Sequence, residues 1–328
     1  MLRWAILGTS FISETVAGAI KQSDGSTLRT VAGRHEGRLK AFADKYAIPH
    51  AVTDFEAAIN DPKIDVVYIG LPSHLHAHYS LLAAAAGKAV LSEKSLTVDM
   101  KSARDLVGGL KQHNTFFVEG LMYLAHPLYG RVTELLTDGR LGTIRAINGF
   151  YAADIAAFVN PAGKGTLYNL GCYPASLLHL VIQSAFGDEI FAARTMAAHA
   201  NRNANDGNIC DTSVSVRFNN GVLATLHSSD THGMSHGFTM MGSKGSLSFQ
   251  TNPWLPVAGD NILLWQPYES EAKTIVVNDP HDAFYHQVKL VERCIAEGCT
   301  EATRPSPRHA DSLAIMKLLT DWEAACRL

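Results

Sequence analysis

The first third of the chain alternates short apolar runs with segments in which apolar residues recur at helical spacing. The apolar runs predict buried strands at 3–7, 28–32, 64–71, 89–91 and 115–119. The segments between them predict helices through 16–20, 39–46, 54–60, 78–86 and 98–112. Strands that alternate with helices lie parallel, because each helix carries the chain back to the same edge of the sheet. We therefore expect a doubly wound parallel α/β sheet.

The pattern changes after residue 121. A helix is predicted at 127–137, and alternating apolar and polar runs then predict strands at 142–150, 190–198, 212–218, 222–228, 238–241, 246–250 and 262–265. Asn219-Asn220-Gly221 is a tight hairpin signal between two of these runs. Helical segments are predicted at 283–297 and 308–327. Hairpin strands after a βα half indicate a second, α+β domain with an open, mostly antiparallel sheet, so we expect domains at 1–121 and 122–328.

Composition supports two folded domains and excludes several classes of partner. The 328 residues are too many for one ordinary domain, and 47% hydrophobic with 18% charged residues can bury a large core. A net charge of −3 gives no long-range attraction to nucleic acid or to an anionic membrane. The sequence contains no run of about 18 apolar residues, so no membrane span is expected, and no signal-peptide pattern is visible at its start. The five cysteines are scattered without a CxxC pair, which favours reduced thiols and a cytoplasmic location.

A turn of small residues follows the first predicted strand, as at the opening of a dinucleotide-binding βαβ unit. Glycines are usual at the first, third and sixth positions of such a turn, where this chain has Gly8, Ser10 and Ser13. Gly8 can make the tight turn, whereas Ser10 adds a hydroxymethyl group where the backbone would approach a pyrophosphate. An ordinary strand-to-helix turn explains the pattern equally well. The residues expected to bind a cofactor here are Gly8, Thr9, Ser10, Phe11 and Ile12.

Basic residues follow the second predicted strand, where an acidic residue would bind the ribose of NAD(H). Arg34, His35 and Arg38 occupy this region instead. A planar guanidinium binds a ribose 2′-phosphate well, so the sequence favours NADP(H) over NAD(H), which stays possible. Alternatively, Arg34 and Arg38 are an exposed i, i+4 pair at the start of a helix whose N-terminus contains Glu36.

Polar residues also follow the next strands, at the edge where open parallel sheets bind ligands. Glu93 and Lys94 end the strand 89–91, and charge at the end of an apolar strand is costly unless it is paired or has a function. A surface ion pair is the alternative. His74, His76 and His78 do not share one helix face, so a loop beneath a nicotinamide ribose is favoured over a metal site. The residues expected to contact the cofactor here are Leu71, Pro72, His74, His76, Glu93, Lys94 and Glu119.

Together these residues resemble the glucose–fructose oxidoreductase / inositol dehydrogenase family, often written Gfo/Idh/MocA, over essentially the whole chain. Four family motifs occur in order, as Gly8 to Ser13, Pro72-Ser73-His74-Leu75-His76, Glu93-Lys94-Ser95 and Met122-Tyr123-Leu124-Ala125-His126-Pro127. The chain departs from them in two places. Ser95 replaces the proline of Glu-Lys-Pro, and Leu124 replaces an arginine near the cofactor.

A fifth segment, 167–174, resembles the Asp-x-Gly-x-His/Tyr catalytic motif of the family in the tyrosine form of the dihydrodiol dehydrogenase-like members. The resemblance implies that Tyr173 is the general acid/base. A phenol titrates near a pKa of about 10, so it needs a nearby cation, which Lys94 can supply. The aspartate of the motif is Asn169 here, which can orient a hydroxyl but cannot exchange a proton. We expect both residues on one side of a helix start; a tyrosine packed in the core is the alternative.

The remaining candidates are weaker. His179 is expected in the core, and no metal site is expected from His199, His227, His232 or His236, which lack ligand spacing. Tyr151, Asp154 and the loop 160–165 could contact substrate, and the sequence does not rank them.

The resemblance implies an NADP(H)-dependent oxidoreductase that acts on a sugar, polyol or cyclic diol. It also implies a homo-oligomer, dimer or tetramer, that forms through the C-terminal sheet, and a last helix that packs on the first domain. The substitutions leave two alternatives open: a catalytically silent cofactor-binding sensor, and a glycosidase that recycles a tightly held NAD+. No nucleic acid, membrane or metal partner is expected.

Overall fold

The computed structural model describes residues 1–326, so Arg327, with which the last predicted helix ends, lies outside the described residues. The chain divides into two compact units, each discontinuous in sequence. The first comprises Met1–Ala125 and Phe284–Leu313, and the second comprises His126–Ala283 and the chain from Ala314 onward. The domain division after residue 121, and the packing of the last helix on the first domain, stay predictions.

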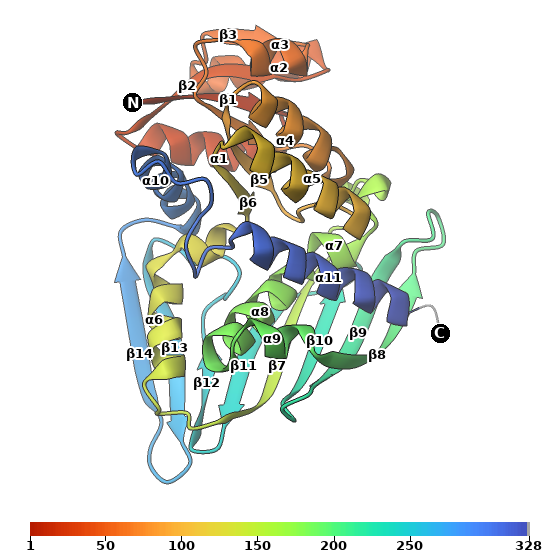
Figure 1. Cartoon of the computed structure of the whole chain (residues 1–328), viewed down its shortest axis with the longest axis vertical. Helices are drawn as coiled ribbons and strands as arrows, with labels where there is room; N and C mark the ends of the chain where they lie inside the picture. Colours follow the sequence, from red (N-terminus) through yellow and green to blue (C-terminus); the bar gives the residue numbers. More distant parts are fainter. Residues whose placement is uncertain (327–328) are drawn as a thin grey trace. The chain divides into compact units, whose positions relative to one another are not determined.

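The first unit contains a six-stranded sheet in the order β3-β2-β1-β4-β5-β6 (Figure 1). Every pair of neighbouring strands is parallel, which confirms the predicted doubly wound sheet. The strands are β1 (Leu2–Leu7), β2 (Ser26–Ala32), β3 (His50–Val52), β4 (Val66–Ile69), β5 (Ala89–Glu93) and β6 (Phe117–Gly120). The helices are α1 (Phe11–Gln22), α2 (Glu36–Tyr46), α3 (Phe55–Asn60), α4 (His76–Ala85), α5 (Met100–His113) and α10 (Ala283–Ala296).

The core of the first unit forms where the apolar strands meet the helices. Trp4, Ile6 and Tyr68 are fully buried on the central strands, as expected for parallel strands covered on both faces. The Trp4 indole N–H donates to the Ser26 hydroxyl at 2.9 Å, so its polar atom has a partner inside the core. Helix α10 contributes Val291 to the same cluster, although it is far from the sheet in sequence.

The second unit contains an eight-stranded sheet in the order β14-β13-β12-β11-β7-β10-β9-β8 (Figure 1). Only the β7–β10 pair is parallel, which confirms a mostly antiparallel sheet. The strands are β7 (Ile144–Ala153), β8 (Arg194–Arg202), β9 (Ile209–Phe218), β10 (Leu223–Ser229), β11 (Met234–Gly242), β12 (Gly245–Phe249), β13 (Gly259–Pro267) and β14 (Lys273–Asp279). The helices are α6 (Pro127–Thr137), α7 (Thr166–Asn169), α8 (Cys172–Phe186), α9 (Asp188–Ala192) and α11 (His309–Ala325), of which the residues from Ala314 belong to this unit.

The structure corrects several predicted elements. The strand predicted at 190–198 is wrong at its start, because Asp188–Ala192 forms α9 and β8 begins at Arg194. Gly187, at φ +91°, ends α8, and two acidic residues then occupy the first turn of α9, where the helix dipole favours them. Strands β3 and β14 were not predicted; both are edge strands with little burial, so their apolar pattern is weak. Strand β5 continues through Glu93, two residues beyond its prediction.

Other expectations about local structure are met. The hairpin between β9 and β10 turns at Gly221, which has a φ of +89°. Helix α6 has the predicted bounds. Short 3₁₀ helices occur at Ser73–Leu75, Met122–Ala125, Ala156–Phe158 and Pro161–Gly163. Among residues 1–326, no helix is both long enough and apolar enough to cross a membrane.

Candidate active site

The small-residue turn between β1 and α1 approaches the end of β4 closely. Gly8 has a φ of +103°, and a Cβ placed on it would lie 2.6 Å from the carbonyl oxygen of Gly70. Only glycine allows this approach. The Ser10 hydroxyl caps α1, because its Oγ accepts the Ser13 N–H at 3.4 Å and lies 3.1 Å from the Ser13 Oγ. The hydroxymethyl group is thus engaged with its own helix, whose first N–H groups and dipole favour an anion.

The neighbouring residues of this turn differ in exposure. Phe11 is 84% exposed at the first position of α1, whereas Thr9 and Ile12 are half-buried. Phe11 is thus a large apolar side chain that contributes nothing to the core. It is available to cover a bound molecule.

The basic segment after β2 is exposed. The side chains of Arg34, His35 and Arg38 make no hydrogen bond or ion pair with the residues that the structure describes. Glu36 begins α2, as predicted, and lies in its first turn. The arrangement leaves two guanidinium groups available to an anion at the carboxyl end of β2.

His76 is fully buried at the start of α4, two residues earlier than the predicted helix start. Its Nε2 lies 2.7 Å from the carbonyl oxygen of Leu71, and its Nδ1 lies 2.8 Å from that of Ser95. Burial lowers the pKa of His76 to about 4, against the effect of the two carbonyls. The neutral ring has one N–H, so it donates to one of these two carbonyls and packs against the other, between the loop after β4 and the segment after β5. His74 and His78 are exposed, so the three histidines do not form one buried cluster.

Glu93 ends β5 with its carboxylate inside the protein. The Tyr68 hydroxyl donates to Glu93 Oε1 at 3.0 Å, and the Lys94 N–H donates to Glu93 Oε2 at 3.2 Å. Burial raises the pKa of Glu93, while the positive charge of Lys94 opposes the shift. Lys94 itself is half-buried, and the peptide bond between Lys94 and Ser95 is cis.

Glu119 lies on the adjacent strand β6 and is also buried. Its Oε1 accepts the Leu96 N–H at 2.7 Å, whereas its Oε2 is buried without a hydrogen-bond partner in the part of the chain that the structure describes. Burial raises the pKa of Glu119 to about 7, with a further contribution from the charge of Glu93. The structure thus brings Glu93, Lys94 and Glu119 together at the carboxyl ends of two neighbouring strands.

Asn169 and Tyr173 lie on two consecutive helices of the second unit. The prediction that both residues lie at the start of one helix is therefore wrong. Asn169 ends α7, and Tyr173 is the second residue of α8. The N–H groups of Leu170 and Gly171 both donate to the Thr166 carbonyl, which closes α7 before α8 begins. Tyr173 is 6% exposed and Asn169 is half-buried. The pairing of Tyr173 with Lys94 stays a prediction.

The ring of Tyr173 packs in an aromatic cluster that the sequence did not predict. Its centroid lies 5.4 Å from that of Tyr151 at an interplanar angle of 75°, and 6.1 Å from that of Trp254. The Trp254 indole N–H donates to the Phe150 carbonyl oxygen at 3.2 Å. Tyr151 was an unranked candidate in the sequence, and no local pattern distinguished Trp254.

Two histidines of the second unit, His179 and His227, contact side chains that are outside the proposed site. His179 is buried edge-to-face against Phe191 at 4.7 Å, as expected for a core residue. His227 Nδ1 lies 2.9 Å from the Ser213 hydroxyl, and its Nε2 lies 3.3 Å from Asp211. Burial lowers the pKa of His227.

Comparisons with known proteins connect these features to an enzyme family. Residues 2–120 match the model of the oxidoreductase family with an NAD-binding Rossmann fold, and residues 129–248 match that of the GFO/IDH/MocA C-terminal domain. The uncharacterized oxidoreductase ORF334 of Rhizobium meliloti is 31% identical over 267 residues, which cover 80% of this chain and 78% of the relative.

Two further proteins are similar along nearly their whole length. D-xylose 1-dehydrogenase (NADP(+)) 2 of Haloferax volcanii is 27% identical over 334 residues, which cover 97% of this chain and 95% of the relative. The structure of KijD10, a 3-ketoreductase from Actinomadura kijaniata in complex with NADP, has a TM-score of 0.85 at 23% identity over 99% of this chain and 97% of that chain. This last likeness supports the fold. The chain belongs to the Gfo/Idh/MocA family of oxidoreductases, with the NAD(P)-binding Rossmann domain of that family.

Proposed function

We propose that this oxidoreductase uses NADP(H) to transfer a hydride to or from a hydroxyl/carbonyl carbon of a sugar, polyol or cyclic diol. The observation on which the proposal rests is Lys94, which follows a buried strand and lies beside two buried carboxyl groups. A cation that is retained among desolvated groups at the ligand-binding edge of a parallel sheet is suited to bind a reacting oxygen. The similarity to a sugar dehydrogenase named for NADP(+) supports the same class of substrate and cofactor.

The residues of the first unit fit a dinucleotide. Gly8 to Ile12 and the N-terminus of α1 suit a pyrophosphate, because Gly8 has no room for a Cβ and the first N–H groups of a helix have no partner within it. Arg34, His35 and Arg38 suit a 2′-phosphate. Leu71, Pro72, His74 and His76 form the loop expected near the nicotinamide ribose.

Three residues of the protein have separate roles in the proposed reaction. The cofactor supplies or accepts the hydride. Tyr173 takes the hydroxyl proton during oxidation and returns it during reduction. Lys94 stabilises the developing negative charge on the substrate oxygen and favours the phenolate of Tyr173. Asn169 orients the hydroxyl by hydrogen bonding and exchanges no proton.

A nicotinamide absorbance assay with NADP+ and a pooled set of aldoses, polyols and cyclic diols tests the proposal. We expect the wild-type protein to reduce NADP+, and Tyr173→Phe and Lys94→Ala each to lose roughly 10²–10⁴-fold in kcat. Tyr268→Phe, which changes a 55% exposed tyrosine, is the matched control and should retain activity. Unchanged turnover in Lys94→Ala would contradict the role of that lysine.

Ser95, Leu124 and Asn169, the three residues that depart from the family motifs, favour one alternative, a cofactor-binding sensor without catalysis. Tight NADPH binding without turnover on the whole pool would support it, and Asn169→Asp would then be the variant to assay. A nicotinamide cofactor that co-purifies and survives dialysis would instead indicate a glycosidase that recycles its cofactor.

The cofactor preference has its own test. Arg34→Ala should lower kcat/KM with NADP+ by about tenfold or more and leave that with NAD+ unchanged, because a charge-assisted pair with the 2′-phosphate is lost. Arg145→Ala, an exposed arginine on β7, is the control. Equal losses with both cofactors would contradict the preference for NADP(H).

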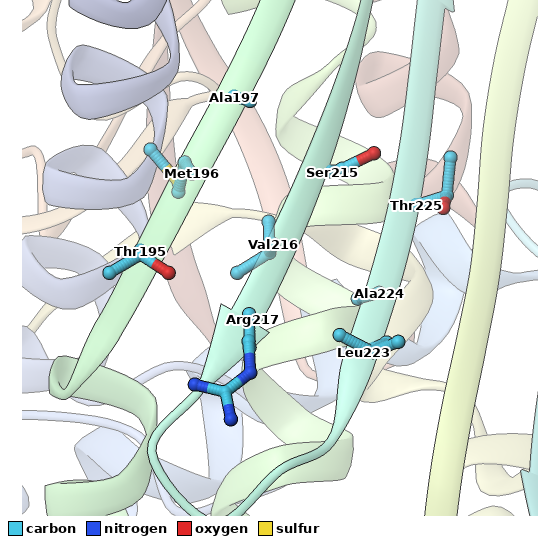
Figure 2. A pocket seen from close by; sticks show the side chains of 9 residues that line it. All are labelled: Thr195, Met196, Ala197, Ser215, Val216, Arg217, Leu223, Ala224 and Thr225. Atoms are coloured by element: carbon cyan, nitrogen blue, oxygen red, sulfur yellow. The ribbon is translucent and has the colours of Figure 1, made fainter.

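We also infer a homo-oligomer that forms through the open face of the second unit's sheet. A hollow of about 350 Å³ lies on this sheet and is lined by residues of β8, β9 and β10. Figure 2 shows these side chains on the three strands. Leu223 is 54% exposed there beside Arg217, a combination common in protein interfaces. Sedimentation of the wild-type protein should give a dimer or tetramer that Leu223→Glu dissociates; a monomeric wild type would contradict the inference.

A further inference from the structure

The hydroxyl of Tyr151 is a polar group that the proposed mechanism does not use. Tyr151 lies on β7 and is buried, with a relative exposure of 7%. Its hydroxyl makes no hydrogen bond with any residue that the structure describes, and it is not among the sealed, partnerless polar atoms. A phenol whose ring is buried and whose oxygen stays accessible can bind an incoming molecule.

The position of this ring is well defined. Its edge-to-face contact with Tyr173 has centroids 5.4 Å apart, and its contact with Trp254 has centroids 6.1 Å apart. Trp254 is itself fully buried, and its indole N–H donates to the carbonyl oxygen of Phe150, the residue before Tyr151. Its backbone N–H donates to Asn252 Oδ1 at 2.9 Å. These contacts hold Tyr151 against Tyr173 from one side, which pre-organises both rings.

The electrostatic surroundings distinguish the two tyrosines. Burial raises the pKa of Tyr151, and the neighbouring Cys172 thiol adds to the shift. A phenol with a raised pKa stays protonated near neutral pH, so it can donate and accept a hydrogen bond but does not serve as a base. The group therefore suits recognition of a neutral hydroxyl.

We propose that Tyr151 is a specificity-determining residue that binds the hydroxyl or carbonyl oxygen on the carbon next to the reacting carbon. The ring of Tyr151 lies 5.4 Å from that of Tyr173, which is assigned to the reacting oxygen, so a substrate held by Tyr173 lies beside Tyr151. The enzyme thus selects 1,2-diols and 2-hydroxycarbonyl compounds, including the C1–C2 unit of an aldose, over isolated alcohols. This inference deepens the proposed function and rests on the role of Tyr173 given there.

Matched pairs of probes test it, with binding and turnover measured separately. The pairs are trans-cyclohexane-1,2-diol with cyclohexanol, and D-glucose with 2-deoxy-D-glucose, each with saturating NADP+. Binding is followed by tryptophan fluorescence, since Trp254 contacts both tyrosines. We expect the wild-type protein to prefer the vicinal member of a pair, and Tyr151→Phe to remove about tenfold of that preference, mainly through KM.

Several readouts separate this role from a structural one. Tyr151→Phe should leave the isolated-hydroxyl probe and the pH profile of kcat unchanged, and Tyr268→Phe should leave everything unchanged. An equal loss on both members of a pair, or a wild-type protein without preference in either pair, overturns the inference. Fluorescence reports binding even when a protein has no turnover. A binding preference for the vicinal member of a pair in a protein without turnover would therefore refute the proposed catalysis and support the role of Tyr151. Full activity of Tyr173→Phe with loss of preference in Tyr151→Phe would separate the two in the same way.

Discussion

The buried carboxyl group of Glu119 makes a sharp prediction about stability. Its Oε1 accepts the Leu96 N–H at 2.7 Å, but burial outweighs this bond and the hydrogen bond with the Ser312 side chain, so the ionised form is disfavoured. Burial raises the pKa of this group from 4.5 to about 7. Glu119→Gln replaces the carboxyl by an amide of nearly the same shape that does not ionise, and thus isolates the effect of the charge.

The sign and size follow from proton linkage. Between pH 4.5 and 7 the folded protein keeps a proton on Glu119 that the unfolded chain has released, so the free energy of unfolding falls as pH rises. The fall ends above the folded-state pKa. Its total is the pKa difference multiplied by about 1.4 kcal/mol, or about 3 kcal/mol. Glu119→Gln lacks this loss, so its stability relative to the wild type should rise by about 3 kcal/mol between pH 4.5 and pH 8.

Urea unfolding of cofactor-free protein, followed by circular dichroism at several pH values, measures this difference. Glu56→Gln, on an exposed position of α3 in the same unit, is the matched control. A carbon-13 titration of the Glu119 carboxyl would check the pKa directly. A stability difference between wild type and Glu119→Gln that stays constant with pH would refute the reasoning.

Three other substitutions test single contacts of the first unit. Gly8→Ala should weaken NADPH binding at least about tenfold by calorimetry, because its Cβ would lie 2.6 Å from Gly70 O at a φ of +103°; unchanged affinity would contradict the close approach. His76→Ala should cost about 2–3 kcal/mol in urea unfolding, since one buried carbonyl loses the ring N–H that it accepts and a cavity forms; a neutral effect would show that the ring contributes no buried hydrogen bond. Asp311→Ala should cost about 3 kcal/mol by the same assay, because Asp311 is buried and paired with Arg304; a smaller loss than in an exposed control, Asp105→Ala, would count against the pair.

Much of the fold could be predicted because it depends on local pattern. Apolar runs such as 3–7 and 64–71 have the length of buried strands, and the helical periodicity between them favours parallel pairing. Gly8 was identifiable because a tight turn between strand and helix needs a residue without a Cβ. Short edge strands such as β3 escaped prediction, since three partly exposed residues have too little pattern. The segment from Ile190 was assigned to a strand because a brief apolar run has no period of its own.

Most of the order of strands and helices, the change from parallel to antiparallel architecture, and the strand-end location of Lys94 could be read from the sequence. These properties follow from neighbours a few residues apart. Which distant residues share an environment depends instead on how the elements pack. Tyr151, Tyr173 and Trp254 come from β7, α8 and the segment between β12 and β13, and only sheet packing brings their rings within about 6 Å of one another. The raised pKa of Glu119 likewise depends on burial, which is a property of the folded chain as a whole.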